Sequence, residues 1–196
     1  MRANKIGQIL ALTALCALLL LALASCGSPA AEPTPSPSQD GASAAPEESF
    51  APGVIAVGAP APDFTAQLVD GTSFQLSEQK DKAVLLNFWA TWCGPCVGEL
   101  PAFTRLVETY VDKIALLAVN CGEDEQTVTG FLEQNGYTFP VALDLEGEIS
   151  SLYPTDGIPY TLIIAPDGTI SSIQLGASGA DEMFDHYSAE LDKALS

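Results

Sequence analysis

The sequence has few of the residues that metal, nucleic-acid or anionic-lipid binding requires. It holds a single histidine and only 7 basic residues against 25 acids, which gives a formal net charge of −18 over 196 residues. No basic cluster interrupts this excess of negative charge, so nucleic acid and anionic membrane surfaces are disfavoured as electrostatic partners. With one histidine and no second cysteine pair, the usual zinc-site patterns are missing, and we expect no metal.

The N-terminal segment is similar to a bacterial lipoprotein leader. Two basic residues among the first five precede an almost wholly apolar run, 6–24, which has the order of a secretory signal. The run ends in LASC at 23–26, which resembles a lipobox, where the cysteine is lipidated after cleavage. We expect a signal peptide over 1–25 and lipidation of Cys26; the alternative is a retained transmembrane anchor. Both place the remainder outside the cytoplasm, tied to a membrane.

A spacer separates this leader from one folded domain. Residues 26–60 are rich in Pro, Ser, Ala and Glu and hold too few large apolar side chains to fold, so we expect a disordered tether. The domain is expected over 61–196, which is long enough for one hydrophobic core. Hydrophobic periodicity and turn residues predict its elements. They are a hairpin over 62–76, a buried strand over 83–90, a helix over 95–111, a strand over 114–119, a helix over 123–136, a short strand over 139–144, a second hairpin over 161–175 and a last helix over 180–195.

Two cysteines follow the first buried strand. The stretch 87–96, NFWATWCGPC, contains Cys93 and Cys96 with Gly94 and Pro95 between them. A zinc site would need a second ligand pair, and a structural disulfide across so short a loop would constrain the unfolded chain little. A C-x-x-C pair after a strand and at the start of a helix is typical of thioredoxin-like redox sites. We therefore interpret the two cysteines as a redox pair.

The expected position of this pair gives each sulfur a role. Free N–H groups and the positive end of the helix dipole stabilise a thiolate at Cys93, which makes it the attacking sulfur. Cys96 lies one turn further on, and we expect it to be more buried and to resolve the mixed disulfide. Pro95 falls in the first helical turn, where its missing N–H has no helical partner.

Over about residues 60–195 the chain resembles the TlpA/ResA-like, membrane-tethered members of the thioredoxin superfamily. The stretches that carry the resemblance are PDF at 62–64, NFWATWCGPCVGELP at 87–101, GYTFPVALD at 136–144, GIPYTLII at 157–164 and PDG at 166–168. The resemblance implies an α/β thioredoxin fold, in which a central mixed sheet is flanked by helices. It adds an N-terminal β-hairpin and an inserted helix-and-strand segment over about 123–152. It also implies thiol–disulfide exchange with no cofactor beyond the redox-active disulfide.

The resemblance assigns substrate binding to residues around the pair. Pro159 matches the family's cis-proline, which leaves the backbone of Ile158 free to bind substrate as a short strand. Trp92 is expected to form a packing and docking surface, together with Gly94 and Pro95 between the cysteines. An ordinary trans loop proline at position 159 is the alternative.

Four other residues of the domain could have a functional role: Glu99, Asn87, Cys121 and His186. Glu99 matches a family acid near the pair, a catalytic residue able to take a proton from Cys96, although a solvated helix glutamate is the alternative. Asn87 stands where cytosolic thioredoxin has a buried aspartate and cannot itself accept a proton. We expect Cys121 to be a small buried residue rather than a third redox thiol, and His186 to be solvated.

The resemblance implies a reductase of protein disulfides on the extracytoplasmic face of the bacterial cell membrane. Its substrates would be proteins such as apocytochrome c, with electrons from a membrane thiol relay of the CcdA/DsbD type, and we expect a monomer. Three alternatives stay open: a disulfide-forming oxidase, an electron donor to an extracellular methionine sulfoxide reductase or peroxidase, and a non-catalytic binding lipoprotein. A peroxiredoxin-like function is less favoured, because the Pro-x-x-x-Thr-x-x-Cys segment that is usual in peroxiredoxins is absent.

Overall fold

The computed structural model of the chain describes residues 53–196. The expected signal peptide, the lipidation site at Cys26 and most of the spacer lie outside the described residues. In the described part, no helix is both long enough and apolar enough to cross a membrane.

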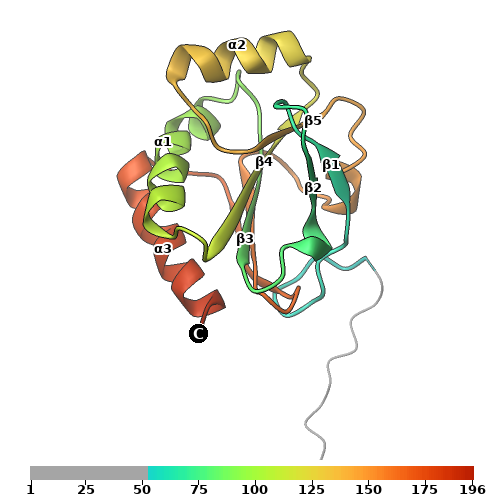
Figure 1. Ribbon diagram of the computed structural model, residues 1–196, viewed down its shortest axis with the longest axis vertical. Helices are drawn as coiled ribbons and strands as arrows, with labels where there is room; N and C mark the ends of the chain where they lie inside the picture. Colours follow the sequence, from blue (N-terminus) through green and yellow to red (C-terminus); the bar gives the residue numbers. More distant parts are fainter. Residues whose placement is uncertain (1–52) are drawn as a thin grey trace, which may run out of the picture. The chain divides into compact units, whose positions relative to one another are not determined.

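A five-stranded mixed sheet forms the middle layer of the domain, in the strand order β5-β4-β3-β6-β7 (Figure 1). Strands β3, β4 and β5 run parallel, whereas β6 is antiparallel to both β3 and β7. All seven residues of β3 are buried, as expected for a strand that is covered on both faces. The elements are β1 Thr65–Gln67, β2 Ser73–Gln75, η1 Leu76–Glu78, β3 Ala83–Trp89, α1 Gly94–Thr109, β4 Ile114–Cys121, α2 Glu125–Asn135, β5 Val141–Asp144, η2 Ser150–Leu152, β6 Tyr160–Ile164, β7 Ile170–Leu175 and α3 Ala180–Ala194.

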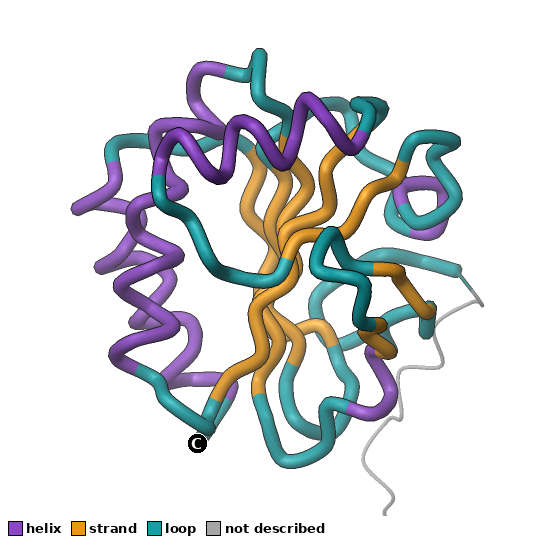
Figure 2. Tube along the Cα trace, turned by 45° about the horizontal axis from the view of Figure 1, so that its top comes forward, coloured by secondary structure: helices purple, strands orange, loops and turns teal. Residues whose placement is uncertain are grey.

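Two hydrophobic clusters lie on opposite faces of this sheet. Helices α1 and α3 pack side by side on one face, which we call the helix face (Figures 1 and 2). The β1–β2 hairpin lies against the other, the hairpin face. Because side chains alternate along a strand, β3 sends Leu85 and Trp89 to the helix face and Leu86 and Phe88 to the hairpin face. By the same alternation, Asn87 projects into the apolar cluster under the helices.

The observed elements match the predicted ones closely. The α/β thioredoxin-like architecture, the N-terminal hairpin and the inserted helix and strand are confirmed. Helix α2 ends at Gly136, which adopts the left-handed conformation that glycine accepts without strain. Helix α1 continues through Pro101. Packing starts slightly before the expected Ala61, since Ala59 is fully buried and its carbonyl accepts the N–H of Ile170 at 2.8 Å.

Candidate functional site

The cysteine pair lies where the central strand passes into the first helix. Cys93 is the N-cap of α1, and its Sγ accepts the backbone N–H of Cys96 at 3.3 Å. The two sulfurs are joined in a disulfide. Cys93 is 6% exposed, whereas Cys96 has no exposed surface, so only the first sulfur can be reached from outside. The expected order of the two cysteines, with Cys96 deeper, is confirmed.

The loop before β6 completes the surroundings of the exposed sulfur. The peptide bond between Ile158 and Pro159 is cis, as the resemblance implied. The Ile158 carbonyl oxygen lies 3.8 Å from Cys93 Sγ, so this backbone borders the sulfur directly. Trp92 is 72% exposed, which places a large apolar surface next to Cys93. A partner that reaches the sulfur therefore meets the indole ring of Trp92 and the backbone of Ile158.

A carboxylate from the next loop holds the turn that carries Trp92. Glu123 accepts the backbone N–H of Thr91 at 2.7 Å and the Thr91 hydroxyl at 2.5 Å. It also accepts Asn120 Nδ2 at 2.8 Å. Glu123 lies within the range predicted for the next helix, 123–136, but it precedes the helix, which begins at Glu125. Asp124 is the N-cap of α2, and its side chain accepts the N–H of Thr127 at 2.8 Å.

Glu99 is a fully buried carboxyl group on the same face of α1 as Cys96. The two residues are three positions apart, a spacing that places side chains next to each other on a helix. Burial raises the pKa of Glu99 from 4.5 to about 7, although hydrogen bonds from Tyr187 and Asn87 act in the opposite direction. The alternative of a solvated glutamate is therefore wrong. A carboxyl group that titrates near neutrality can both accept and release a proton at ordinary pH.

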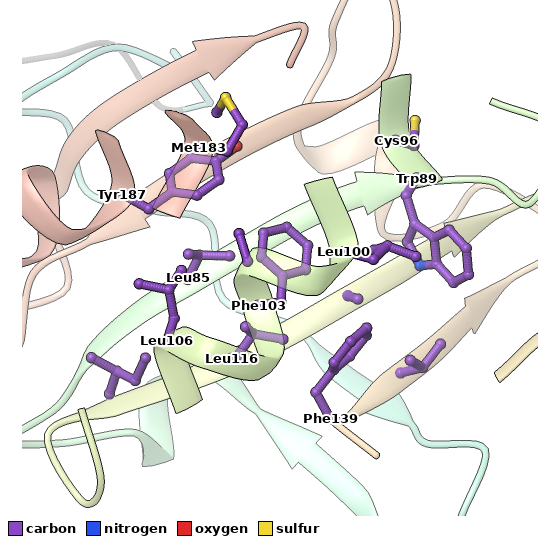
Figure 3. Close-up of a cluster of buried hydrophobic side chains, with 14 of the residues drawn as sticks. Leu85, Trp89, Cys96, Leu100, Phe103, Leu106, Leu116, Phe139, Met183 and Tyr187 are labelled. Carbon is purple, nitrogen blue, oxygen red and sulfur yellow. The ribbon is translucent and has the colours of Figure 1, made fainter. Parts of the chain in front are cut away.

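Three neighbours make Glu99 part of a buried polar network. Asn87 Nδ2 donates to Glu99 Oε1 at 3.0 Å, and the Tyr187 hydroxyl donates to Glu99 Oε2 at 2.8 Å. Thr161 Oγ1 lies 2.9 Å from Asn87 Nδ2 and 3.0 Å from the Tyr187 hydroxyl. Figure 3 shows Tyr187 reaching from α3 toward Phe103 on α1, within the same buried cluster.

The sequence-based interpretation missed Thr161 and Tyr187. A threonine within an apolar strand signals nothing by itself, and the buried Tyr187 shares the spacing of Met183 and Leu191, which is that of an ordinary core face. The signal that was available is Asn87, because a buried amide in a central strand requires partners from the elements that cover it.

The other polar candidates lie apart from this network. Cys121 is half-buried, its Sγ lies 3.8 Å from the Ser150 hydroxyl, and burial raises the pKa of its thiol. His186 is not the solvated residue we expected: it is half-buried, and Nε2 has no hydrogen-bond partner among the described residues. Within residues 53–196 no group of three His, Cys, Asp or Glu side chains could hold a metal ion.

Comparisons with known proteins agree with this geometry. Residues 57–173 match the model of the AhpC/TSA family. The thiol-disulfide oxidoreductase ResA of Geobacillus thermodenitrificans is 35% identical over 133 residues, which cover 67% of this chain and 76% of that protein. The thioredoxin-like protein YneN of Bacillus subtilis is 39% identical over 132 residues, covering 66% and 77%.

Solved structures show the same likeness. The crystal structure of a protein described as a thiol:disulfide interchange protein DsbE, from Chlorobium tepidum, superposes with a TM-score of 0.67 at 29% identity; the match covers 73% of this chain and all of that one. StoA from Bacillus subtilis gives a TM-score of 0.56 at 28% identity, covering 65% and 97%. The chain therefore belongs to the AhpC/TSA family and is a thiol-disulfide oxidoreductase of the ResA/DsbE type, built around the pair Cys93 and Cys96.

Proposed function

We propose that the protein is a lipid-anchored reductase of protein disulfides on the extracytoplasmic face of a bacterial membrane, serving substrates such as apocytochrome c. The observation that carries the proposal is the placement of Cys93. Its sulfur caps α1, accepts the N–H of Cys96, and borders the carbonyl of Ile158 next to cis-Pro159. Gly94 and Pro95 form the dipeptide that the resemblance associates with reducing members.

The exchange proceeds in two steps that balance in electrons. The thiolate of Cys93 attacks one sulfur of the substrate disulfide; that bond breaks, a mixed disulfide forms, and the second substrate sulfur leaves as a thiolate. Cys96 then loses its proton and attacks Cys93, which releases the other substrate sulfur. The substrate gains two electrons and the protein ends with the Cys93–Cys96 disulfide. A membrane thiol relay of the CcdA/DsbD type would reduce it again.

Glu99 supplies the proton acceptor for the second step. Cys96 is fully buried, so its thiol cannot pass its proton directly to bulk water. Glu99 lies on the same buried helix face with its pKa near 7, so its ionised form can accept that proton at neutral pH. Asn87 holds the carboxylate by a hydrogen bond, but its amide does not titrate and cannot accept the proton of Cys96.

The direction of electron flow is tested by the redox potential. Equilibration with mixtures of reduced and oxidised glutathione, followed by mass spectrometry of the alkylated protein, measures it. We expect a value near −270 mV, as for thioredoxin, and well below the approximately −120 mV of DsbA. A potential close to that of DsbA would overturn the reductase and favour disulfide formation.

The substrate is tested by trapping. Without the resolving thiol, Cys96→Ser should accumulate a mixed disulfide through Cys93. We would offer it a disulfide-bonded peptide with the Cys-x-x-Cys-His haem-attachment sequence, in competition with the same peptide scrambled so that the cysteines are further apart. Preferential capture of the haem-attachment peptide supports the cytochrome c assignment. Equal capture would remove it and leave a general reductase.

The anchor is tested at Cys26. In cells that process lipoproteins, Cys26→Ser should move the protein from the detergent phase to the aqueous phase on phase separation, because stable attachment requires the acyl chains. Cys16→Ser is the matched control, since Cys16 lies inside the expected signal peptide. Retention of Cys26→Ser in the detergent phase would show that the attachment is a membrane helix.

A further inference from the structure

Four side chains from four elements close a ring of hydrogen bonds under the helices. Asn87 comes from β3, Glu99 from α1, Thr161 from β6 and Tyr187 from α3, and each contacts the next at 2.8–3.0 Å. Asn87 and Thr161 face each other in the register of the antiparallel pair β3–β6. All four are at most 1% exposed. The ring is therefore shielded from water, and its own members determine the hydrogen bonding of Glu99.

Counting protons fixes the direction of each bond. A tyrosine hydroxyl has one proton, and Tyr187 uses it on Glu99 Oε2, so Thr161 donates to the Tyr187 oxygen. The Asn87 amide then supplies its two protons to Glu99 Oε1 and Thr161 Oγ1. In this arrangement every donor of the ring is used and Glu99 accepts twice, which is the arrangement of an ionised carboxylate. Only Asn87 Oδ1 is left without a partner.

Few other charged or titratable groups lie close enough to Glu99 to affect its protonation. Neither of the two salt bridges among the described residues includes Glu99. The phenol of Tyr187, whose pKa is raised by burial, contacts Glu99 directly, and Cys96, a thiol only when the disulfide is reduced, lies three positions earlier on α1. On α3, His186 packs its ring 5.4 Å from that of Tyr187. Since no cation among residues 53–196 forms an ion pair with Glu99, the two donated hydrogen bonds are what favours the ionised form against burial.

We propose that Tyr187 is a positioning residue, which through its hydrogen bond within the ring determines the pH at which Glu99 can accept the proton of Cys96. The link to Cys96 rests on the proposed function; the effect of Tyr187 on Glu99 does not. The hydroxyl of Tyr187 bonds to Glu99 and Thr161 and to neither active-site cysteine, so it acts by holding Glu99 Oε2 in the acceptor state. Helix α3, which is far from Cys93 in the sequence, thereby takes part in setting the reactivity of the redox pair.

The ring also indicates what happens when the proton arrives. Protonated Glu99 has a hydrogen to donate, but Asn87 Nδ2 and the Tyr187 hydroxyl both point donors at it. One of them must turn. If the Asn87 amide rotates, its unpartnered Oδ1 accepts a hydrogen bond from the protonated Glu99, and Tyr187 keeps its bond to the other oxygen. The same rotation breaks the bond from Asn87 Nδ2 to Thr161, so proton uptake is accompanied by a turn of one buried amide and a change in the ring.

The test measures the titration of Glu99 in the oxidised protein, where the disulfide keeps both active-site thiols from titrating. Carbon-13 NMR of carboxyl-labelled glutamate, assigned by loss of one signal in Glu99→Gln, follows the midpoint directly. For Tyr187→Phe we expect the midpoint to rise by about one pH unit, because a hydrogen bond to the charged form is lost. For Thr161→Val, which removes the donor to the Tyr187 oxygen, we expect a smaller rise.

Tyr110→Phe is the matched control. The Tyr110 hydroxyl also links α1 to α3, through the Ser188 carbonyl at 3.1 Å and Asp192 at 2.9 Å, but it does not contact Glu99. We expect no change in the Glu99 midpoint. An equal rise in this variant would show that the effect is a loosened helix contact, and it would overturn the proposal. So would an unchanged midpoint in Tyr187→Phe or, if that variant does not fold, in Thr161→Val.

A second measurement separates this inference from the proposed function. When the reduced protein is mixed with a peptide disulfide, the rate at which the Cys93 mixed disulfide is resolved should show a pH midpoint that moves upward with the Glu99 midpoint in Tyr187→Phe. If Glu99 shifts but the rate profile does not, the positioning by Tyr187 stands and the role of Glu99 as proton acceptor fails. If neither moves, Tyr187 has no positioning role.

Discussion

The two faces of the central sheet each bury a carboxyl group, and the two groups are held in different ways. Glu99, on the helix face, accepts hydrogen bonds from the side chains of Asn87 and Tyr187. Asp144, on the hairpin face, is 4% exposed and accepts the backbone N–H groups of Ile149 and Ser150 at 2.9 and 2.8 Å. The first is bound only by side chains that can reorient; the second is bound by two backbone amides that are fixed in a turn, together with the Ser150 hydroxyl.

This difference separates a chemical role from a structural one. The backbone amides at Asp144 always donate, so that carboxylate ties the end of β5 to the turn before η2. Hydroxyl and amide side chains at Glu99 can rotate to suit either protonation state. The cysteine pair also borders the helix face, where Cys96 belongs to the same cluster as Tyr187. We infer that reorientable polar groups are buried on the face where a proton must move.

The largest expected effect comes from replacing one cysteine on each face of the sheet by serine, in separate variants. Cys93→Ser removes the attacking sulfur, so reduction of insulin by dithiothreitol should fall to the uncatalysed rate. Cys121 packs against the hairpin-face cluster, and Cys121→Ser should leave the rate unchanged. Loss of activity in Cys121→Ser would show that a third thiol takes part in the exchange.

The next effect tests the two carboxyl groups directly. Glu99→Gln keeps the shape of the side chain but removes the proton acceptor, so resolution of the mixed disulfide at neutral pH should slow by about 100-fold. Asp144→Asn is the comparison on the hairpin face and should change this rate less than twofold. Single-turnover kinetics with a peptide disulfide measure the resolution step. Equal slowing in both variants would show that the rate responds to the loss of any buried carboxylate, and not to the loss of the proton acceptor at Glu99.

The pH dependence of stability gives a third test. Because the pKa of Glu99 rises from 4.5 unfolded to about 7 folded, the folded protein binds the extra proton between these values. The contribution of Glu99 to stability is therefore greatest below about pH 4.5, and it decreases by about 3 kcal/mol as the pH rises to 7. Urea unfolding at several pH values should show this slope in the wild type and in Asp144→Asn. If the same slope of stability against pH persisted in Glu99→Gln, a group other than Glu99 would be its cause.

Much of the fold and half of the site could be predicted from the sequence. The strand over 83–90 and the helix after it are encoded locally, in a continuous apolar run and a regular spacing, so Cys93 and Cys96 were placed correctly. Glu123 and Tyr187 were not, because their roles depend on contacts between segments far apart in the chain. Thr91 and Glu123 are separated by 32 positions, and Glu99 and Tyr187 by 88. Neither residue type departs from what a solvated helix start or a core helix face would contain.

The smallest expected effect concerns the exposed Trp92 and whether it contributes to substrate binding beside Cys93. Trp92 is 72% exposed, so Trp92→Ala should change stability by less than about 0.5 kcal/mol. The KM for a protein disulfide should rise several-fold with kcat unchanged, because an exposed indole adds contact area that substrate and transition state share equally. Val111, 64% exposed beyond the far end of α1, provides the control, and Val111→Ala should leave both constants as they are. If kcat falls and KM stays constant in Trp92→Ala, the ring acts on the sulfur chemistry itself. Trp92 would then belong to the groups that take part in the chemistry, and not to a docking surface separate from them.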